Sequence, residues 1–216
     1  MKTLSTLALS ALLAMAISSP ANAITVTLDF EGATSFAPVG DLYNGAGSDN
    51  YGLRFSGEAL ALANDGTGPG PNGEFFSNAP TPGTVMFATG APALLRTMAF
   101  GDSLINQISF YYSSATAALG AVQIFSSDDG SGVALASADL SANSGAACTG
   151  PYCHWDQVML NFVGDAHSIS FGNFDSAAFD NISVTVTAVP EPSMLMLLLV
   201  SAGGLFATAR RRTRGG

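Results

Sequence analysis

Apolar and polar residues alternate along much of this chain with a period of two. The alternation is clearest in 24–30, where apolar residues stand at every second position. It returns in 51–55, 104–112, 122–124, 158–162, 169–171 and 182–186, with a shorter candidate at 85–87 and an ambiguous one at 133–140. Successive side chains of a β-strand point to opposite faces, so this period is typical of strands with one buried face. The pattern therefore predicts a chain built mainly of short strands.

Clusters of glycine, asparagine, aspartate and serine separate the predicted strands, at 45–50, 65–73, 128–132 and 143–150. Asp129-Gly130, between two apolar runs, predicts a β-hairpin, because glycine accepts the positive φ of tight hairpin turns. No segment keeps a helical period for long, and 91–100 is the best short candidate for a helix. The fold is therefore expected to be all-β, a two-sheet antiparallel sandwich, with the glycine- and proline-rich segment 66–82 as a long surface loop.

The first 23 residues have the order of a secretory signal peptide. Lys2 gives a positive start, 4–17 is an unbroken run of apolar or small residues, and Ala21-Asn22-Ala23 places small residues at the −3 and −1 positions of a cleavage site. A buried core helix, the alternative interpretation, does not require this order. The chain is therefore expected to be exported and cleaved after Ala23.

The last 28 residues, 189–216, have a three-part order of their own. Val189-Pro190-Glu191-Pro192-Ser193 is followed by the apolar segment 194–209 and by a basic end, 210–216. As a transmembrane helix, 194–209 would span about 24 Å, and arginines that reach to the interface can make up the difference to a ~30 Å hydrocarbon core. The basic end should stay cytoplasmic, which leaves the preceding domain on the far side of the membrane. A plain tail anchor is one interpretation of this order.

The tail also resembles the PEP-CTERM sorting signal of Gram-negative bacteria, in which a Pro-Glu-Pro motif, a transmembrane stretch and an arginine-rich terminus follow one another. The resemblance rests on Val189, Pro190, Glu191 and Pro192, with the apolar and basic segments behind them. It implies that the membrane transpeptidase exosortase is a partner, that the inner membrane holds an intermediate, and that the destination is the cell surface or the extracellular matrix. The two prolines keep the motif extended for a processing enzyme.

Removing both ends leaves one domain, 24–188, whose charge is strongly one-sided. The whole chain has 16 acidic and 7 basic residues, but Arg54 and Arg96 are the only basic residues of the domain and Glu191 is the only acidic residue outside it. With 15 acids against 2 bases, the domain has a formal charge of −13. A surface of this sign repels phosphate groups, which excludes nucleic acids and anionic lipid surfaces as partners.

Three segments of the domain resemble a jelly-roll, galactose-binding-like sandwich: the opening Leu28-Asp29-Phe30-Glu31-Gly32, the central hairpin 122–130 and the closing Phe179-Asp180-Asn181-Ile182-Ser183-Val184. The resemblance implies that the first and last strands pair and that a structural Ca²⁺ lies beside them. Glu31 ends the first predicted strand and Asp180 opens the last, so these two carboxylates are the candidate ligands, since Ca²⁺ prefers carboxylate and carbonyl oxygens. The alternative is that both are solvated acids at strand ends.

The two cysteines lie close together in the sequence. Cys148 and Cys153 enclose four residues, and in an exported chain such a pair predicts a local disulfide. A loop this short closes at little entropic cost, so the bridge should stiffen a turn more than it stabilises the fold. His154 follows directly, which leaves a Cys/Cys/His metal site as the alternative, although a fourth ligand at metal spacing is absent.

Gly101-Asp102-Ser103-Leu104 is similar to the nucleophile motif of GDSL-type esterases and lipases. Such chemistry needs a serine activated by a histidine that an acid orients, together with an oxyanion hole. The motif stands in the middle of the chain, directly before a predicted strand, and Asp165-Ala166-His167 lacks the spacing of the family's later Asp-x-x-His. We therefore expect a tight turn before a strand, and no catalytic activity.

Several aromatic residues could stack on sugar rings, because flat aromatic faces suit the apolar faces of pyranoses. They are Tyr51, Phe75, Phe76, Tyr111, Tyr112 and Trp155. Trp155, beside the predicted disulfide loop, is the best single candidate for a ligand contact. Core packing is the ordinary alternative for the others.

Together these features predict an exported, exosortase-processed protein of the cell surface or extracellular matrix, non-catalytic, with an adhesive or matrix-associated role. The alternative is a carbohydrate-binding module with a defined glycan site for extracellular polysaccharide. An aromatic groove near Trp155 would favour the carbohydrate-binding module, and a Ser103–histidine hydrogen bond in a cleft would favour an esterase.

Overall fold

Strands form nearly all the regular structure of the protein. The computed structural model describes residues 22–46, 49–98, 103–172 and 176–188, and within them Ala23–Thr187 form one compact unit. Eleven strands and one short 3₁₀ turn, η1 (Pro71–Gly73), occur there, with no α-helix in these ranges. None of these residues belongs to a helix long and apolar enough to cross a membrane. The predicted sorting motif, transmembrane segment and residues 1–21 of the predicted signal peptide lie outside the described residues, and Asn22 and Ala23, the last two residues of that peptide, begin β1.

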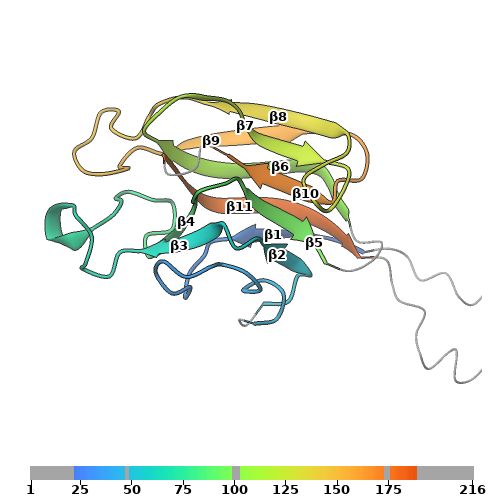
Figure 1. Cartoon of the computed structure of the whole chain (residues 1–216), viewed down its shortest axis with the longest axis horizontal. Coiled ribbons are helices and arrows are strands. Elements are labelled where there is room, and N and C mark those ends of the chain that lie inside the picture. The colour runs from blue at the N-terminus through green and yellow to red at the C-terminus, as the bar shows by residue number, and fades with distance from the viewer. Residues whose placement is uncertain (1–21, 47–48, 99–102, 173–175, 189–216) are drawn as a thin grey trace, which may run out of the picture. The chain divides into compact units, whose positions relative to one another are not determined.

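The strands form two sheets of antiparallel neighbours, stacked as layers in Figure 1. The first sheet has the order β3 (Ala59–Ala63), β4 (Thr84–Ala88), β11 (Ala177–Ala188), β6 (Ser103–Ser114) and β9 (Asp156–Asn161), and β1 (Asn22–Leu28) also pairs with β11. The second has the order β2 (Leu53–Phe55), β5 (Ala93–Thr97), β10 (Ser168–Phe171), β7 (Ala118–Phe125) and β8 (Ala134–Leu140). The predicted all-β, two-sheet antiparallel sandwich is confirmed.

The pairing of the strands is nested. β7 pairs with β8, β6 with β9, β5 with β10 and β4 with β11, each pair enclosing the one before it in the sequence. A single long antiparallel hairpin wrapped into two facing sheets gives this arrangement, and it is the strand order of a jelly roll. The resemblance of the sequence to that fold also implied a pairing of the first and last strands, and β1 does pair with β11.

Two segments differ from the sequence-based expectation. Residues 91–100 were the best helix candidate, but 93–97 form β5, in which Ala93, Leu95 and Thr97 are buried and the residues between them are half-exposed. Burial does alternate with a period of two in this segment. The sequence does not show the alternation, because apolar alanines and leucines stand on both faces of the strand. The second segment, β3, has the sequence Ala-Leu-Ala-Leu-Ala, which was not predicted as a strand because alanine has a weak strand propensity.

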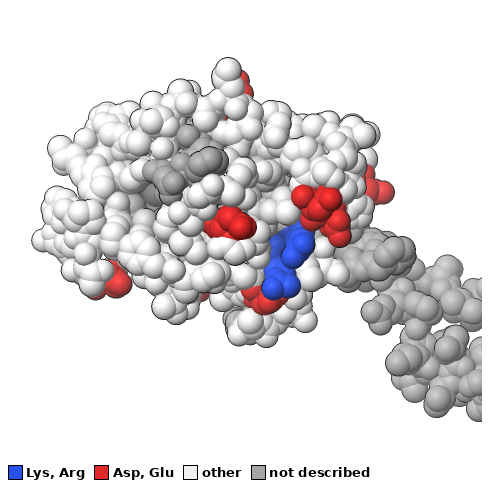
Figure 2. Space-filling view, in the orientation of Figure 1, with Lys and Arg blue, Asp and Glu red and all other residues white. Residues whose placement is uncertain are grey.

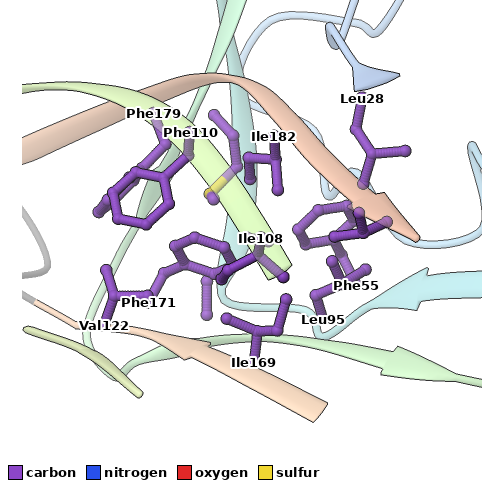
Figure 3. Close-up of a cluster of buried hydrophobic side chains, with 14 of the residues drawn as sticks. Leu28, Phe55, Leu95, Ile108, Phe110, Val122, Ile169, Phe171, Phe179 and Ile182 are labelled. Atoms are coloured by element: carbon purple, nitrogen blue, oxygen red, sulfur yellow. The ribbon is translucent and has the colours of Figure 1, made fainter. Parts of the chain in front are cut away.

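The core lies between the sheets. Figure 3 shows its side chains, with Ile108, Phe110, Phe179 and Ile182 from the first sheet meeting Val122, Ile169 and Phe171 from the second. The rings of Phe110, Phe171 and Phe179 meet edge to face, with centroids 5.1–5.9 Å apart. All of these residues except Phe179 belong to predicted strands, so alternation in the sequence located most of the core.

A β-bulge interrupts β11. Asp180 stands opposite Tyr111 and Ser183 opposite Ser109, so one extra residue is accommodated between them, and Asn181 there has a φ of 47°. A bulge re-aims the side chains that follow it. Here it returns Ile182 to the inner face that Phe179 occupies, and it leaves Asp180 at the point where the ladder is disturbed.

The surface carries few charges. Figure 2 shows the described basic residues, Arg54 and Arg96, beside each other on a face that is otherwise mostly uncharged, with acidic residues on either side. The two arginines are direct cross-strand partners in β2 and β5, and Arg54 forms an ion pair with Asp41 at 3.3 Å.

Candidate functional site

The outer face of the first sheet is apolar where β3, β4 and β11 meet. Its cross-strand register places Leu60 opposite Phe87, Leu62 opposite Val85, and Ala178 opposite Phe87. These side chains point away from the core between the sheets, because the alternate residues Ala61, Met86 and Phe179 are the ones that fill it. Val85 is nevertheless fully buried and Ala178 is only 3% exposed, so something else must cover this face.

Two loops cover it, 64–82 and the disulfide segment 148–155. Phe76 from the first loop is buried against Val85 and Ala178, and Trp155 packs edge-on against Phe76 with ring centroids 6.3 Å apart. The indole N–H of Trp155 donates a 3.0 Å hydrogen bond to the carbonyl of Ser77. A second, smaller hydrophobic cluster therefore lies on the outside of the sandwich.

Polar side chains fix the two covering loops. The carbonyl oxygen of the Asn64 side chain accepts from the backbone N–H of Phe75 at 2.9 Å, and its amide donates to the carbonyl of Phe76 at 3.0 Å. The amide of Asn78 donates to the carbonyl of Cys153 at 3.1 Å, which joins one loop to the other. Asparagine side chains here replace the backbone partners that a strand would have supplied.

The predicted disulfide is confirmed. Cys148 and Cys153 are bonded, with their Cα atoms 6.0 Å apart. The alternative metal site is not formed, because both sulfurs are in the bridge and Nε2 of His154 contacts Oδ1 of Asp156 at 3.1 Å. The bridge holds the turn that carries Tyr152.

A pocket opens between the covering loops and the sheet. It has a volume of about 180 Å³ and is partly open to solvent. Leu62 and Phe87 come from the sheet and Phe76 and Tyr152 from the covering loops, and the remaining lining residues are Ser176, Ala177 and Ala178. The wall is mainly apolar, and the side-chain polar groups on it are hydroxyls.

The aromatic surface continues beyond the pocket through Phe36. This residue is 54% exposed, and its ring meets Phe75 at 5.2 Å and Phe87 at 6.3 Å between centroids, edge-on in both cases. Other apolar side chains are more exposed, Leu119 and Val163 among them, but Phe36 is in ring contact with Phe87 of the pocket wall and so extends its apolar surface. This pocket and the adjoining Phe36 form the candidate site.

The structure places Trp155 next to this site rather than in its wall. Trp155 supports Phe76 from behind, and Tyr152, three residues earlier, lines the pocket instead. Of the other stacking candidates from the sequence, Phe76 lines the pocket and Phe75 lies beside it, in contact with Phe36. Tyr51 stacks on Tyr43 with ring centroids 6.4 Å apart, so it serves packing.

The other two tyrosine candidates lie away from the pocket. Tyr112 is 4% exposed, and its hydroxyl accepts from the N–H of Ser141 at 3.2 Å. Tyr111 is half-exposed on β6. Neither lines the pocket.

Phe76 is the one residue of the described pocket wall that the sequence analysis singled out as a candidate; the other six are Leu62, Phe87, Tyr152, Ser176, Ala177 and Ala178. A signal for Phe87 exists, because β4 reads Thr-Val-Met-Phe-Ala without a polar residue on either parity after its first position. A strand that is apolar on both faces must be covered on both. Tyr152 carried no such signal, because its place depends on the disulfide turn.

Ser103 stands at the start of β6 and is 5% exposed. Its hydroxyl forms a 2.8 Å hydrogen bond with the hydroxyl of Thr187, the residue that pairs with it in the β6–β11 ladder. The hydrogen-bond partner of the Ser103 hydroxyl is therefore its cross-strand neighbour in β11.

The two carboxylates proposed as metal ligands hold the same segment of chain, 81–84. Oε1 of Glu31 accepts from the backbone N–H groups of Gly83 and Thr84, both at 2.9 Å. Oδ2 of Asp180 accepts from the N–H of Thr81 at 2.8 Å. Both acids thus lie beside the segment that leads into β4, as the pairing of the terminal strands predicted.

Asp180 is an unusual carboxylate because it is fully buried. Burial is the main cause that raises the pKa of Asp180 to about 7; the N–H groups of Thr81 and Asn181 act against it, and the nearby carboxylates of Asp29 and Glu31 add a smaller upward effect. Burial likewise raises the pKa of the neighbouring Tyr43, whose hydroxyl oxygen accepts the N–H of Phe30. A buried acid among other acids favours any cation or proton that neutralises it.

The donor atoms at Asp180 and Glu31 are of the kind that calcium takes. Carboxylate oxygens that accept one or two N–H groups keep further lone pairs for a metal. However, the described ranges contain no group of three or more acidic, histidine or cysteine side chains placed to hold a metal ion. Backbone carbonyl and water oxygens would have to complete the six to eight ligands of calcium.

No family model matches the sequence, and no curated protein matches it. Among solved structures, the chain is similar to the K2 cleaved adhesin domain of Lys-gingipain, at 12% identity and a TM-score of 0.47, covering 74% of this chain and 99% of that one. It is also similar to a family 6 carbohydrate-binding module (14% identity, TM-score 0.38, 73% and 90% covered). A third similar structure is a family 11 carbohydrate-binding module from Clostridium thermocellum, at 14% identity and a TM-score of 0.31, covering 77% of this chain and 96% of that one. At these values no ligand or activity transfers from those proteins to this chain.

The raised pKa of Asp180 predicts how stability depends on pH in metal-free protein. An aspartate in an unfolded chain titrates near pH 3.9, so between about pH 4 and pH 7 the folded chain keeps a proton that the unfolded chain has lost. This contribution to the free energy of unfolding is full below about pH 4 and is lost as the pH rises through 7, at about 1.4 kcal/mol per unit of pKa difference. Asp180→Asn does not titrate, so its melting temperature should fall less between pH 5 and pH 8 than that of the unmutated chain.

Melting curves recorded in EDTA at the two pH values measure this difference. Asp165→Asn, a substitution at an exposed loop residue, is the matched control and should behave like the unmutated chain. An equal pH dependence in Asp180→Asn and the unmutated chain would contradict the prediction.

Proposed function

We propose that this protein is an exported, non-catalytic adhesion protein of the cell surface or extracellular matrix, and that its sandwich domain binds extracellular polysaccharide through the pocket between the covering loops and the sheet. The observation that carries the proposal is the aromatic wall of this pocket, with Phe76, Phe87 and Tyr152 in it and Phe36 beside it. Aromatic faces bury the apolar faces of sugar rings without needing charge.

The fixed state of the covering loops supports a binding role. The disulfide, the Asn64 and Asn78 side chains and the Trp155–Ser77 hydrogen bond hold Phe76 and Tyr152 in place before any ligand arrives. A preformed site loses less conformational freedom on binding, so more of the contact energy appears as affinity.

The contacts of Ser103 support a non-catalytic role over that of an esterase. Ser103 has Thr187 as its hydrogen-bond partner and lies in a strand ladder, whereas a nucleophilic serine needs a histidine within hydrogen-bond reach. The described residues of the pocket wall offer hydroxyls and no acid or base, which supports binding without catalysis.

Removing one aromatic wall should weaken polysaccharide binding. Phe87→Ala deletes a half-exposed ring from the pocket wall, and the loss of buried apolar contact should lower the affinity about tenfold or more. Affinity gel electrophoresis against a panel of soluble polysaccharides (xylan, mixed-linkage glucan, dextran and mannan) measures the change. Phe125→Ala, at a half-buried phenylalanine of β7 outside the pocket, is the control and should leave binding unchanged. If both variants bind as the unmutated chain does, the pocket is not the binding site.

Export and sorting are the second part of the proposal, and they rest on the two ends of the sequence. Replacing Pro190-Glu191-Pro192 by alanines removes the motif while the apolar and basic segments remain. In the native host a longer, membrane-bound form should then accumulate, detected by fractionation and by the intact mass of the mature protein. A mature mass that is unchanged and still includes Arg214 would leave only a plain tail anchor.

The third part is one structural Ca²⁺ at Glu31 and Asp180. A metal that binds only the folded chain stabilises it by about 2.7 kcal/mol at a free concentration of 100 times Kd, which raises the melting temperature by several degrees. Asp180→Asn should abolish this shift, because a carboxamide keeps the shape of the side chain and loses its charge, and Asp165→Asn should retain it. A melting temperature that responds neither to EDTA nor to millimolar Ca²⁺ would rule the site out.

A further inference from the structure

The described part of the pocket wall is mainly apolar, and this restricts the sugar that can enter it; the inference rests on the proposed function. Among the described residues, Leu62, Phe76, Phe87 and Ala178 contribute apolar side chains, and the polar side chains are the hydroxyl-bearing Tyr152 and Ser176. Every hydroxyl group of a sugar that enters the pocket loses hydrogen bonds to water. Two hydroxyls in the wall can replace few of them.

The size of the pocket limits the ligand to one ring. A dry apolar cavity of about 150 Å³ holds benzene, so the volume of about 180 Å³ here accommodates a single six-membered ring. An unbranched polymer would have to pass a continuous groove, which this volume does not provide. The sugar unit that enters the pocket is therefore at the end of a polysaccharide chain or in a side branch of it.

The absence of charge in the described wall also restricts which sugars can bind. None of the described residues that line the pocket is charged, so a uronate carboxylate or an amino-sugar ammonium group would lose its water there without gaining a counter-ion. The domain as a whole is strongly acidic, which further disfavours acidic sugars. The ligand should be a neutral sugar.

These three restrictions together favour a sugar that carries a methyl group where an ordinary hexose carries a hydroxymethyl group. We propose that the pocket selects a neutral 6-deoxyhexose, at a chain end or as a side branch of the polysaccharide, with its methyl group against the half-exposed Leu62 and Phe87. The methyl group gains apolar contact in the pocket, whereas the hydroxyl of the matching hexose would be buried without a partner.

Matched sugar pairs test the proposal, because L-fucose differs from L-galactose, and L-rhamnose from L-mannose, only by the hydroxyl at carbon 6. Titration of the full chain in detergent, followed by saturation-transfer NMR or calorimetry, measures the four affinities. In at least one pair the 6-deoxy sugar should bind ten to a hundredfold more tightly than its hexose. Phe87→Ala should abolish this binding.

A second variant keeps the test independent of changes in folding. Ala178→Ser adds one hydroxyl to the pocket wall with almost no change in volume, so the preference for the 6-deoxy sugar should shrink severalfold as the hexose gains a hydrogen bond. Ala138→Ser, at a half-buried alanine of β8 outside the pocket, is the control and should keep the full preference.

The possible failures are distinguishable. Equal affinities within both pairs, or tighter binding of an N-acetylated or acidic sugar, with binding still lost in Phe87→Ala, would overturn the selectivity and leave the proposed function intact. An absence of binding for every monosaccharide and polysaccharide tested would overturn both.

Discussion

The pairing of β4 with β11 is the constraint on which both the fold and the candidate site depend. It is the outermost of the four nested pairs, so it joins segments of the chain that are far apart in sequence. Phe179 opposite Met86 belongs to the core, while Ala178 opposite Phe87 belongs to the pocket. Because neighbouring residues of a strand face opposite ways, the contacts that stabilise the sandwich also fix the pocket wall.

An apolar outer face needs a cover, and this need explains the long loop 64–82. Leaving Val85 and Ala178 in water would forfeit about 25 cal/mol for each Å² of apolar surface. The loop cannot cover them as a strand, because its prolines lack N–H donors, so side chains such as Asn64 satisfy its backbone instead. The cover is incomplete at one place, between Phe76 and Tyr152, and the candidate site lies there.

The sequence predicted the sandwich well because its signal is local. Alternation alone located most strands and most of the core, and only the alanine-rich β3 and β5 escaped it, since alanine and leucine occur in helices and strands alike. The site was only partly predictable. Trp155 directed attention to the right loop, but the residues that line the pocket come from β3, β4, β11 and three loops, and no local pattern brings these together. The role of Asp180 as a buried acceptor for Thr81, 99 residues away in sequence, is equally non-local.

The charge of the domain acts on a partner at long range, whereas the apolar wall of the pocket acts only on contact. The two therefore make different contributions to any adhesive contact. The excess of acidic residues repels other acidic polymers and other copies of the domain, but salt screens that repulsion beyond about 8 Å at physiological ionic strength. Contact in the pocket is apolar and hardly depends on salt. Adhesion through this pocket would therefore gain nothing from electrostatic steering, and its specificity would have to come from the shape and polarity of a wall that the disulfide and the asparagine side chains hold in place.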